Sequence, residues 1–198
     1  MSSNGVTLPT GEQALQMLME GNARYVSGQF AHPNQTAVRR TELSGGQYPF
    51  AIILGCSDSR VPPEVIFDQG LGDLFIIRVA GNIIDDVVLG SIEYAAEHLH
   101  TPLLVVLGHT KCGAVTAVAG GGELEGHLPS LAAAIQPAVD KAKAEGGDLV
   151  PTAIKHNATM TAEQLAASTP VLAHLVESGH LKVVTAIYDI DSGEVYTI

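Results

Sequence analysis

Residues 50–60 read FAIILGCSDSR and residues 103–114 read LLVVLGHTKCGA, and in each stretch an apolar run leads into a short polar motif that contains a cysteine. An uninterrupted apolar run of this length is typical of a strand covered on both faces, as in a parallel sheet. Groups that follow neighbouring parallel strands meet at the carboxyl edge of the sheet, where α/β proteins bind ligands. The two stretches therefore predict an α/β fold that brings Cys56, His109 and Cys112 together.

Helical and strand patterns alternate through the rest of the chain. A capping-box spacing at Thr10 and Gln13 predicts an opening helix that ends near Gly28. The pattern predicts strands over 50–54, 74–79, 103–107 and 182–188. It predicts a short helix that begins at 62–63 and longer helices over 87–99, 113–119, 131–144 and 162–176. A turn at 191–193 precedes a final strand over 194–198. We expect a mostly parallel central sheet of four to five strands flanked by helices, with a C-terminal hairpin edge and an N-terminal helical arm.

Length and composition indicate how many domains the chain forms and which kinds of partner it can bind. The 198 residues suit a single domain, 1–198, which we divide into a helical arm over 1–45 and a catalytic α/β core over 46–198. A net charge of -11 without a basic cluster argues against nucleic-acid binding. Charged residues make up only 16% of the chain and hydrophobic ones 46%, more apolar than a lone domain needs, so we expect contact with another subunit. With no membrane span or leader pattern, we expect a cytoplasmic protein with reduced cysteines.

The predicted cluster at the sheet edge has the composition of a metal site. A lone cysteine after a strand is most often a small buried hydrophobe, but two such cysteines with a histidine at ligand spacing favour a metal. Two sulfurs and one nitrogen suit zinc, and three protein ligands leave the fourth position for water, which zinc activates as a hydroxide near neutral pH. A closed structural site would need a third thiol, and the chain has two cysteines. We therefore expect a catalytic zinc ion whose bound hydroxide attacks a carbon electrophile.

Two charged residues flank the first cysteine. Asp58 and Arg60 lie two positions apart in CSDSR, so both side chains can point the same way and pair. An Asp held by Arg stays ionised and can accept the proton of the zinc-bound water. Without that partner, the same carboxylate could bind zinc and close the site.

The segments CSDSR and GHTKCGA, with FDQGLGDLFIIRVAGN between them, closely resemble the β-class carbonic anhydrases. The resemblance runs from the opening helix to the final hairpin. It implies the reversible hydration of carbon dioxide to bicarbonate and a proton, with one zinc ion per subunit held by Cys56, His109 and Cys112. It also implies an Asp58–Arg60 dyad and assembly as a homodimer or a dimer of dimers, with each active site built between two subunits.

The resemblance also points to a carbon dioxide pocket and to a subclass. Residues expected to form this pocket are Gln47, Val61, Phe75, Tyr94 and Gly113, with Gln47 donating one orienting hydrogen bond across the subunit interface. In the subclass that closes at low pH, a Trp helps hold an inhibitory bicarbonate; this chain has no Trp, and Ile53 stands at the matching position. Arg78 and Tyr188 match the other members of that inhibitory site. We expect the constitutively open subclass.

Two alternatives remain open at this level. A carbon disulfide or carbonyl sulfide hydrolase would use the same fold and the same attack on a linear molecule. A thiol redox protein or a non-catalytic bicarbonate sensor would also use the cysteines, although the chain lacks the Cys-x-x-Cys spacing of a catalytic dithiol.

Overall fold

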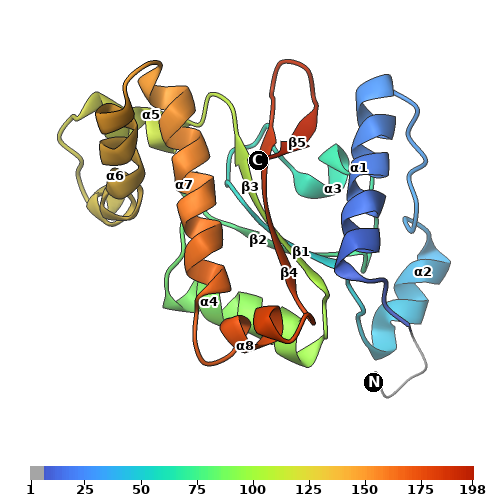
Figure 1. Ribbon diagram of the computed structural model, residues 1–198. Helices are drawn as coiled ribbons and strands as arrows, with labels where there is room; N and C mark the ends of the chain where they lie inside the picture. The colour runs from blue at the N-terminus through green and yellow to red at the C-terminus, as the bar shows by residue number, and fades with distance from the viewer. Residues whose placement is uncertain (1–6) are drawn as a thin grey trace.

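The computed structural model describes residues 7–198, which are built around a five-stranded sheet in the order β2-β1-β3-β4-β5 (Figure 1). The first four strands are parallel, and β5 runs antiparallel to β4, so both the predicted parallel sheet and the C-terminal hairpin are confirmed. The strands are β1 (Ala51–Gly55), β2 (Leu74–Arg78), β3 (Leu103–His109), β4 (Lys182–Tyr188) and β5 (Val195–Thr197).

The strand register places the two cysteine motifs at one edge of this sheet. β1 and β3 are neighbours, and Gly55 at the end of β1 pairs with Leu107 near the end of β3. Every residue of both strands is buried, as their uninterrupted apolar sequences predict. Cys56 directly follows β1 and His109 ends β3, so the two side chains arrive at the same carboxyl edge.

Helices cover both faces of the sheet (Figure 1). In the view of Figure 1, α1 and α3 lie on one side of the sheet, α5, α6 and α7 on the other, and α4 and α8 below it. A π-helical turn at Tyr94–His98 continues α4. The helices are α1 (Gly11–Ser27), α2 (Ala37–Glu42), α3 (Pro63–Ile66), α4 (Asp86–Glu93), α5 (Gly113–Gly120), α6 (Leu128–Glu145), α7 (Leu149–Ala166) and α8 (Leu172–Glu177).

The opening helix forms as its sequence predicts. Thr10 accepts a hydrogen bond from the Gln13 backbone, the Gln13 side chain bonds back to Thr10, and Gly28 ends the helix in the left-handed conformation. The buried face of α1 includes Ala14 and Leu18, both fully shielded from solvent.

The helix expected over 162–176 is wrong in its bounds. That stretch is divided between the end of α7 and a separate helix, α8, and α7 begins much earlier, at Leu149. Pro170 is the reason for the break, because it lacks a backbone N–H and disfavours helical torsions in the residue before it. Pro151 did not prevent the early start, because it lies in the first turn of α7, where backbone N–H groups have no helical partner.

Within residues 7–198, none of the helices combines the length and apolar character needed to cross a bilayer.

Candidate metal centre

Three buried donor atoms converge at the carboxyl edge of the sheet. The sulfurs of Cys56 and Cys112 and a ring nitrogen of His109 all lie within 4.8 Å of one another, and the three residues are 4%, 1% and 1% exposed. The two sulfurs are 4.0 Å apart and form no disulfide. Tetrahedral zinc with Zn–S bonds of about 2.3 Å would require a sulfur–sulfur distance of about 3.8 Å. The spacing therefore fits a shared metal ion.

The hydrogen bonding of His109 leaves one ring nitrogen without a partner. Nδ1 lies 2.9 Å from the Thr110 carbonyl oxygen, and because a carbonyl can only accept, Nδ1 must carry the proton. Nε2 then presents a lone pair, and it is buried without a hydrogen-bond partner among the described residues. A buried polar atom in this state is costly unless something binds it. A metal ion held jointly with the two sulfurs would satisfy it.

The surroundings of the two thiols favour negative charge on the pair. A hydrogen bond from Cys112 lowers the pKa of Cys56 well below its usual value, and the Gly81 amide, 3.3 Å from the Cys56 sulfur, acts in the same direction. The same bond to Cys56, together with burial, raises the pKa of Cys112. Cys112 stands at the N-cap of α5, where the helix dipole favours an anion. These contacts favour the thiolate form of Cys56, and a bound metal ion would favour the thiolate form of both cysteines.

Asp58 and Arg60 form the ion pair that their spacing predicts. Arg60 Nε lies 2.9 Å from Asp58 Oδ1 and Nη2 lies 2.7 Å from Oδ2, in a bidentate arrangement. These bonds hold the pKa of Asp58 far below its usual range, so the carboxylate is ionised at neutral pH. Asp58 Oδ2 is 3.9 Å from His109 Nε2, which places the charge beside the three candidate donor atoms.

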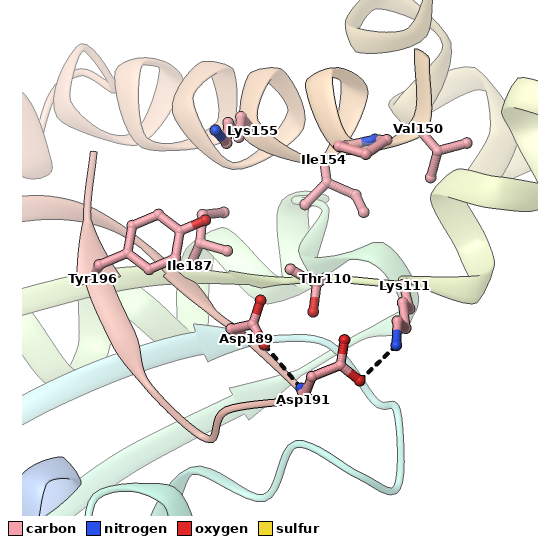
Figure 2. Close-up of a pocket in the computed structure, with 10 residues that line it drawn as sticks. Thr110, Lys111, Val150, Ile154, Lys155, Ile187, Asp189, Asp191 and Tyr196 are labelled. Atoms are coloured by element: carbon pink, nitrogen blue, oxygen red, sulfur yellow. Dashed lines mark hydrogen bonds and ion pairs between the residues drawn. The ribbon is translucent and has the colours of Figure 1, made fainter. Parts of the chain in front are cut away.

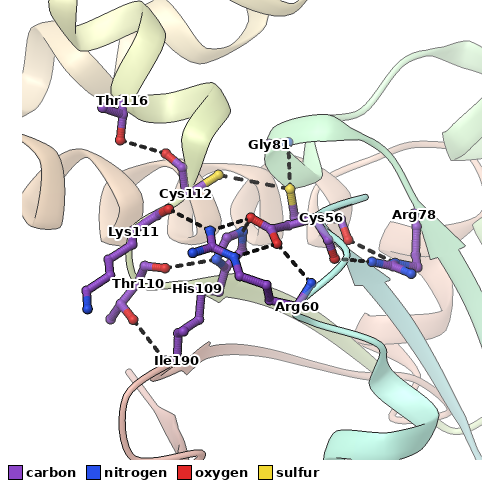
Figure 3. A network of polar contacts seen from close by, with 11 residues as sticks. Cys56, Arg60, Arg78, Gly81, His109, Thr110, Lys111, Cys112, Thr116 and Ile190 are labelled. Carbon is purple, nitrogen blue, oxygen red and sulfur yellow. Dashed lines mark hydrogen bonds and ion pairs between the residues drawn. The ribbon is translucent and has the colours of Figure 1, made fainter.

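Two arginines donate hydrogen bonds to backbone carbonyls of the cysteine motifs (Figure 3). Arg78, at the end of β2, donates to the carbonyl oxygens of Cys56 and Asp58. Arg60 also donates to the Lys111 carbonyl at 3.2 Å, so the first motif is linked to the second through its own dyad.

The turn between β4 and β5 contacts the second cysteine motif through a hydrogen bond and an ion pair. The Thr110 side chain accepts a hydrogen bond from the Ile190 amide at 3.0 Å, and Lys111 pairs with Asp191 at 2.6 Å. A cavity of about 390 Å³ separates this turn from α7 (Figure 2). Its lining includes Thr110 and Lys111 but none of the three donor side chains, so it is distinct from the metal centre.

The other predicted site residues occupy different environments. Val61 is buried close after the first motif, and Gly113 is the exposed first residue of α5. Phe75 on β2 and Tyr94 after α4 lie side by side with ring centroids 6.2 Å apart, and Tyr94 is 47% exposed. Gln47 is exposed in the segment before β1. The structure thus brings Phe75 and Tyr94 together at the outer strand of the sheet.

Sequence reasoning missed Gly81 as a contact of the metal centre. Its amide donates to the Cys56 sulfur, and Gly81 adopts φ +75, a conformation that glycine favours. A glycine next to Asn82 after a strand indicates a turn, but the primary sequence does not show which atom the turn approaches.

Comparisons with known proteins agree with this geometry. The family model described as carbonic anhydrase matches residues 51–195. Carbonic anhydrase 2 of Mycobacterium tuberculosis is 41% identical over 184 residues, covering 91% of this chain and 89% of the relative. Among solved structures, the β-carbonic anhydrase CcaA is 30% identical with a TM-score of 0.73 and coverage of 92% and 94%; a tetrameric β-carbonic anhydrase from Sordaria macrospora is 26% identical with a TM-score of 0.74 and coverage of 94% and 95%. The chain belongs to the β-class carbonic anhydrases.

Proposed function

We propose that Cys56, His109 and Cys112 hold a zinc ion and that the enzyme catalyses the reversible hydration of carbon dioxide to bicarbonate and a proton. The observation that carries the proposal is the buried, unpartnered Nε2 of His109, which faces two sulfurs at the spacing of a tetrahedral site. A bound zinc ion would supply a Lewis acid that makes water nucleophilic near neutral pH.

The residues around the three ligands have separate tasks in this proposal. Asp58 is ionised and lies beside the His109 nitrogen, so it can accept a proton and orient the attacking water. Arg60 holds Asp58 in that position through two side-chain hydrogen bonds. Val61, Phe75 and Tyr94 supply apolar walls for a small apolar substrate, and Gln47 supplies a hydrogen-bond donor from the neighbouring subunit. Gly113 leaves room for the substrate at the start of α5, where a Cβ atom would meet no other atom within 4 Å.

A second copy of the chain would complete the site. β2 is the outer strand of the sheet, and its apolar residues Leu74–Ile77 are each only partly buried. An apolar outer strand on a monomer would expose unpaired backbone groups and hydrophobic surface. We therefore assign β2 and the adjacent α4 to a dimer interface, and pairs of dimers would form a tetramer.

The contacts of Arg78 and Tyr188 support the constitutively open subclass. Arg78 is engaged with backbone carbonyls, and the Tyr188 hydroxyl lies 3.0 Å from that of Tyr25 on α1. Ile53, at the position of the missing Trp, is fully buried in β1. In this arrangement the side chains expected to hold an inhibitory bicarbonate are already bonded within the protein. The free cysteines suit a reducing compartment, and we place the enzyme in the cytoplasm.

Metal analysis combined with a substrate comparison tests the proposal. We expect freshly isolated protein to contain about one zinc per chain and to hydrate carbon dioxide, with activity that is lost on chelation and returns when zinc is added. Brisk release of sulfide from carbon disulfide or carbonyl sulfide, with negligible hydration of carbon dioxide, would show that one of these sulfur compounds is the substrate. Two freely titratable thiols in untreated native protein without metal would contradict the zinc centre and favour a redox or sensing role.

A further inference from the structure

A buried side-chain amide on α7 is hydrogen-bonded to a residue that contacts the metal centre. Asn157 is 4% exposed and lies on the face of α7 that packs against β3 and β4, among Ala153, Ala158 and Ala162. A primary amide in such apolar surroundings is costly unless it is hydrogen-bonded. Its Nδ2 donates to the carbonyl oxygen of Gly81 at 2.7 Å, which accounts for a polar residue at this position.

Gly81 transmits this contact to a metal-binding sulfur. Its carbonyl receives the Asn157 bond, and its own amide donates to the Cys56 sulfur at 3.3 Å. The two groups flank one α-carbon, so a bond that fixes the carbonyl also restrains the torsions that aim the amide. Glycine alone would leave these torsions loose. A side chain here is excluded, because a Cβ atom would lie 2.7 Å from the terminal methyl of Ile135 and φ is +75.

We infer that Asn157 is a positioning residue for the metal centre: through Gly81 it holds an N–H donor on the Cys56 sulfur and so sets how strongly that thiolate donates to the metal. An N–H donor withdraws electron density from a thiolate, and groups that hydrogen-bond to ligands govern ligand orientation and metal affinity. The inference rests on the proposed metal centre and adds a residue from a helix that contributes no ligand.

Cobalt(II) substitution tests this relay with a readout that does not depend on turnover. Cobalt bound by thiolates gives sulfur-to-metal charge-transfer absorption, which moves to longer wavelength when the sulfur becomes richer in electrons. Asn157→Leu removes the donor and keeps the branching and the number of non-hydrogen atoms of the side chain. We expect its charge-transfer band to move to longer wavelength than in the wild type, and zinc affinity measured by chelator competition to fall about 10-fold.

Thr161→Val is the matched control. Thr161 is 6% exposed on the same helix, so this change also deletes a buried polar group but touches neither Gly81 nor Cys56. We expect its spectrum and zinc affinity to match the wild type. If Asn157→Leu does not fold, Asn157→Ser, in which the shortened side chain cannot span to Gly81, answers the same question.

The outcomes separate the relay from the metal centre. A wild-type protein without a charge-transfer band would overturn the metal centre and the relay with it. A wild-type band that is unchanged in the Asn157 variant, with unchanged zinc affinity, would overturn the relay alone and leave Asn157 as a packing residue.

Discussion

Asp58 places a negative charge 3.9 Å from the His109 nitrogen that faces the two sulfurs, and Arg60 balances that charge. The bidentate bond from Arg60 keeps the carboxylate ionised, and because both Asp58 oxygens are bonded to the guanidinium, the pair keeps Asp58 from moving onto a metal held by Cys56, His109 and Cys112. A charge fixed beside the reacting atoms can accept a proton without the reorganisation that a mobile group would need. In the proposed site, the dyad can therefore serve as a positioned acceptor for the proton of the attacking water.

Removing the charge of Asp58 while keeping its shape should slow catalysis without removing the metal. We expect Asp58→Asn to lower kcat/KM for hydration by about 100-fold, the usual size of a general-base contribution, while zinc content stays unchanged. Because the pKa of Asp58 lies below its usual value, the wild-type pH–rate profile should show no inflection from it above about pH 4. Stopped-flow hydration assays between pH 6 and 9, paired with elemental analysis, measure both.

Asp191→Asn provides the control for this substitution. Asp191 is also a carboxylate near the second motif, but its side chain is 69% exposed and it pairs only with exposed Lys111. Such a pair contributes little, so the hydration rate should stay within about twofold of the wild type. An Asp58→Asn enzyme with full activity would show that the base is another group.

The three candidate ligand residues could be predicted from sequence, whereas the residues that support them could not. Cys56 follows β1, His109 ends β3 and Cys112 comes three residues later, so the pairing of these two strands brings the three residues together. Asn157 is separated from Cys56 by most of the chain, and the period of its helix indicates only that the position is buried. Which carbonyl the amide meets depends on the packing of α7 against the 79–82 turn, and no local pattern encodes it.

At the scale of elements, a buried ion pair attaches α1 to the rest of the protein. The Asp68 side chain is 1% exposed and accepts hydrogen bonds from Arg24 on α1 and from the amides of Ala31 and His32. Burial opposes ionisation of Asp68, but these hydrogen bonds outweigh it and lower its pKa. One carboxylate thus fixes both the end of α1 and the segment that leaves it.

Asp68→Asn should therefore destabilise the fold in a pH-dependent way. We expect the free energy of unfolding at pH 7 to fall by about 2 kcal/mol, since the buried position loses the charge that accepts hydrogen bonds from Arg24 and from two backbone amides. The folded pKa of Asp68 lies below its unfolded value of about 3.9, so its contribution is present above that pH and lost as the pH falls through the folded pKa. Urea unfolding at several pH values should show that the stabilities of the two proteins converge in acid.

Glu12→Gln is the control. It breaks an exposed pair with Lys182 and should change the free energy of unfolding by less than about 0.5 kcal/mol. A constant difference between wild type and Asp68→Asn down to pH 3 would contradict the assignment.

Element bounds were predictable where the sequence carries a stop signal. Gly28 ends α1 and Gly179 follows α8, both with positive φ, as a glycine after an apolar helical period predicts. The start of α7 at Leu149 was not predicted, and in the structure the N-cap residue Asp148 makes no side-chain cap. α7 packs against β3 and β4, and no local sequence pattern encodes these contacts.

At the scale of the whole molecule, composition and structure indicate the same incomplete surface. The chain has more hydrophobic residues than a single domain of its size needs, and the excess is visible at the outer strand β2 and on α4. Val87 on α4 is 77% exposed, Tyr94 just beyond it is 47% exposed, and α4 packs beside β2. Sequence could predict that such a surface exists but not where it lies, because that depends on which strand ends the sheet.

Val87→Asp tests whether this surface joins two subunits. On a monomer, an aspartate at a position this exposed should change the free energy of unfolding by no more than about 0.5 kcal/mol. In a dimer it would bury an unpaired charge in an apolar interface, so the association should weaken by several kcal/mol. We expect sedimentation velocity at micromolar concentration to show a wild-type dimer or tetramer and a smaller Val87→Asp species. Hydration activity should fall in parallel, because Gln47 would then have no neighbouring subunit whose site it could enter.

Leu128→Asp is the control. It lies at an exposed apolar position at the start of α6 and should keep the wild-type mass. A monomeric wild type, or a Val87→Asp protein with unchanged mass, would place the subunit contact elsewhere or remove it.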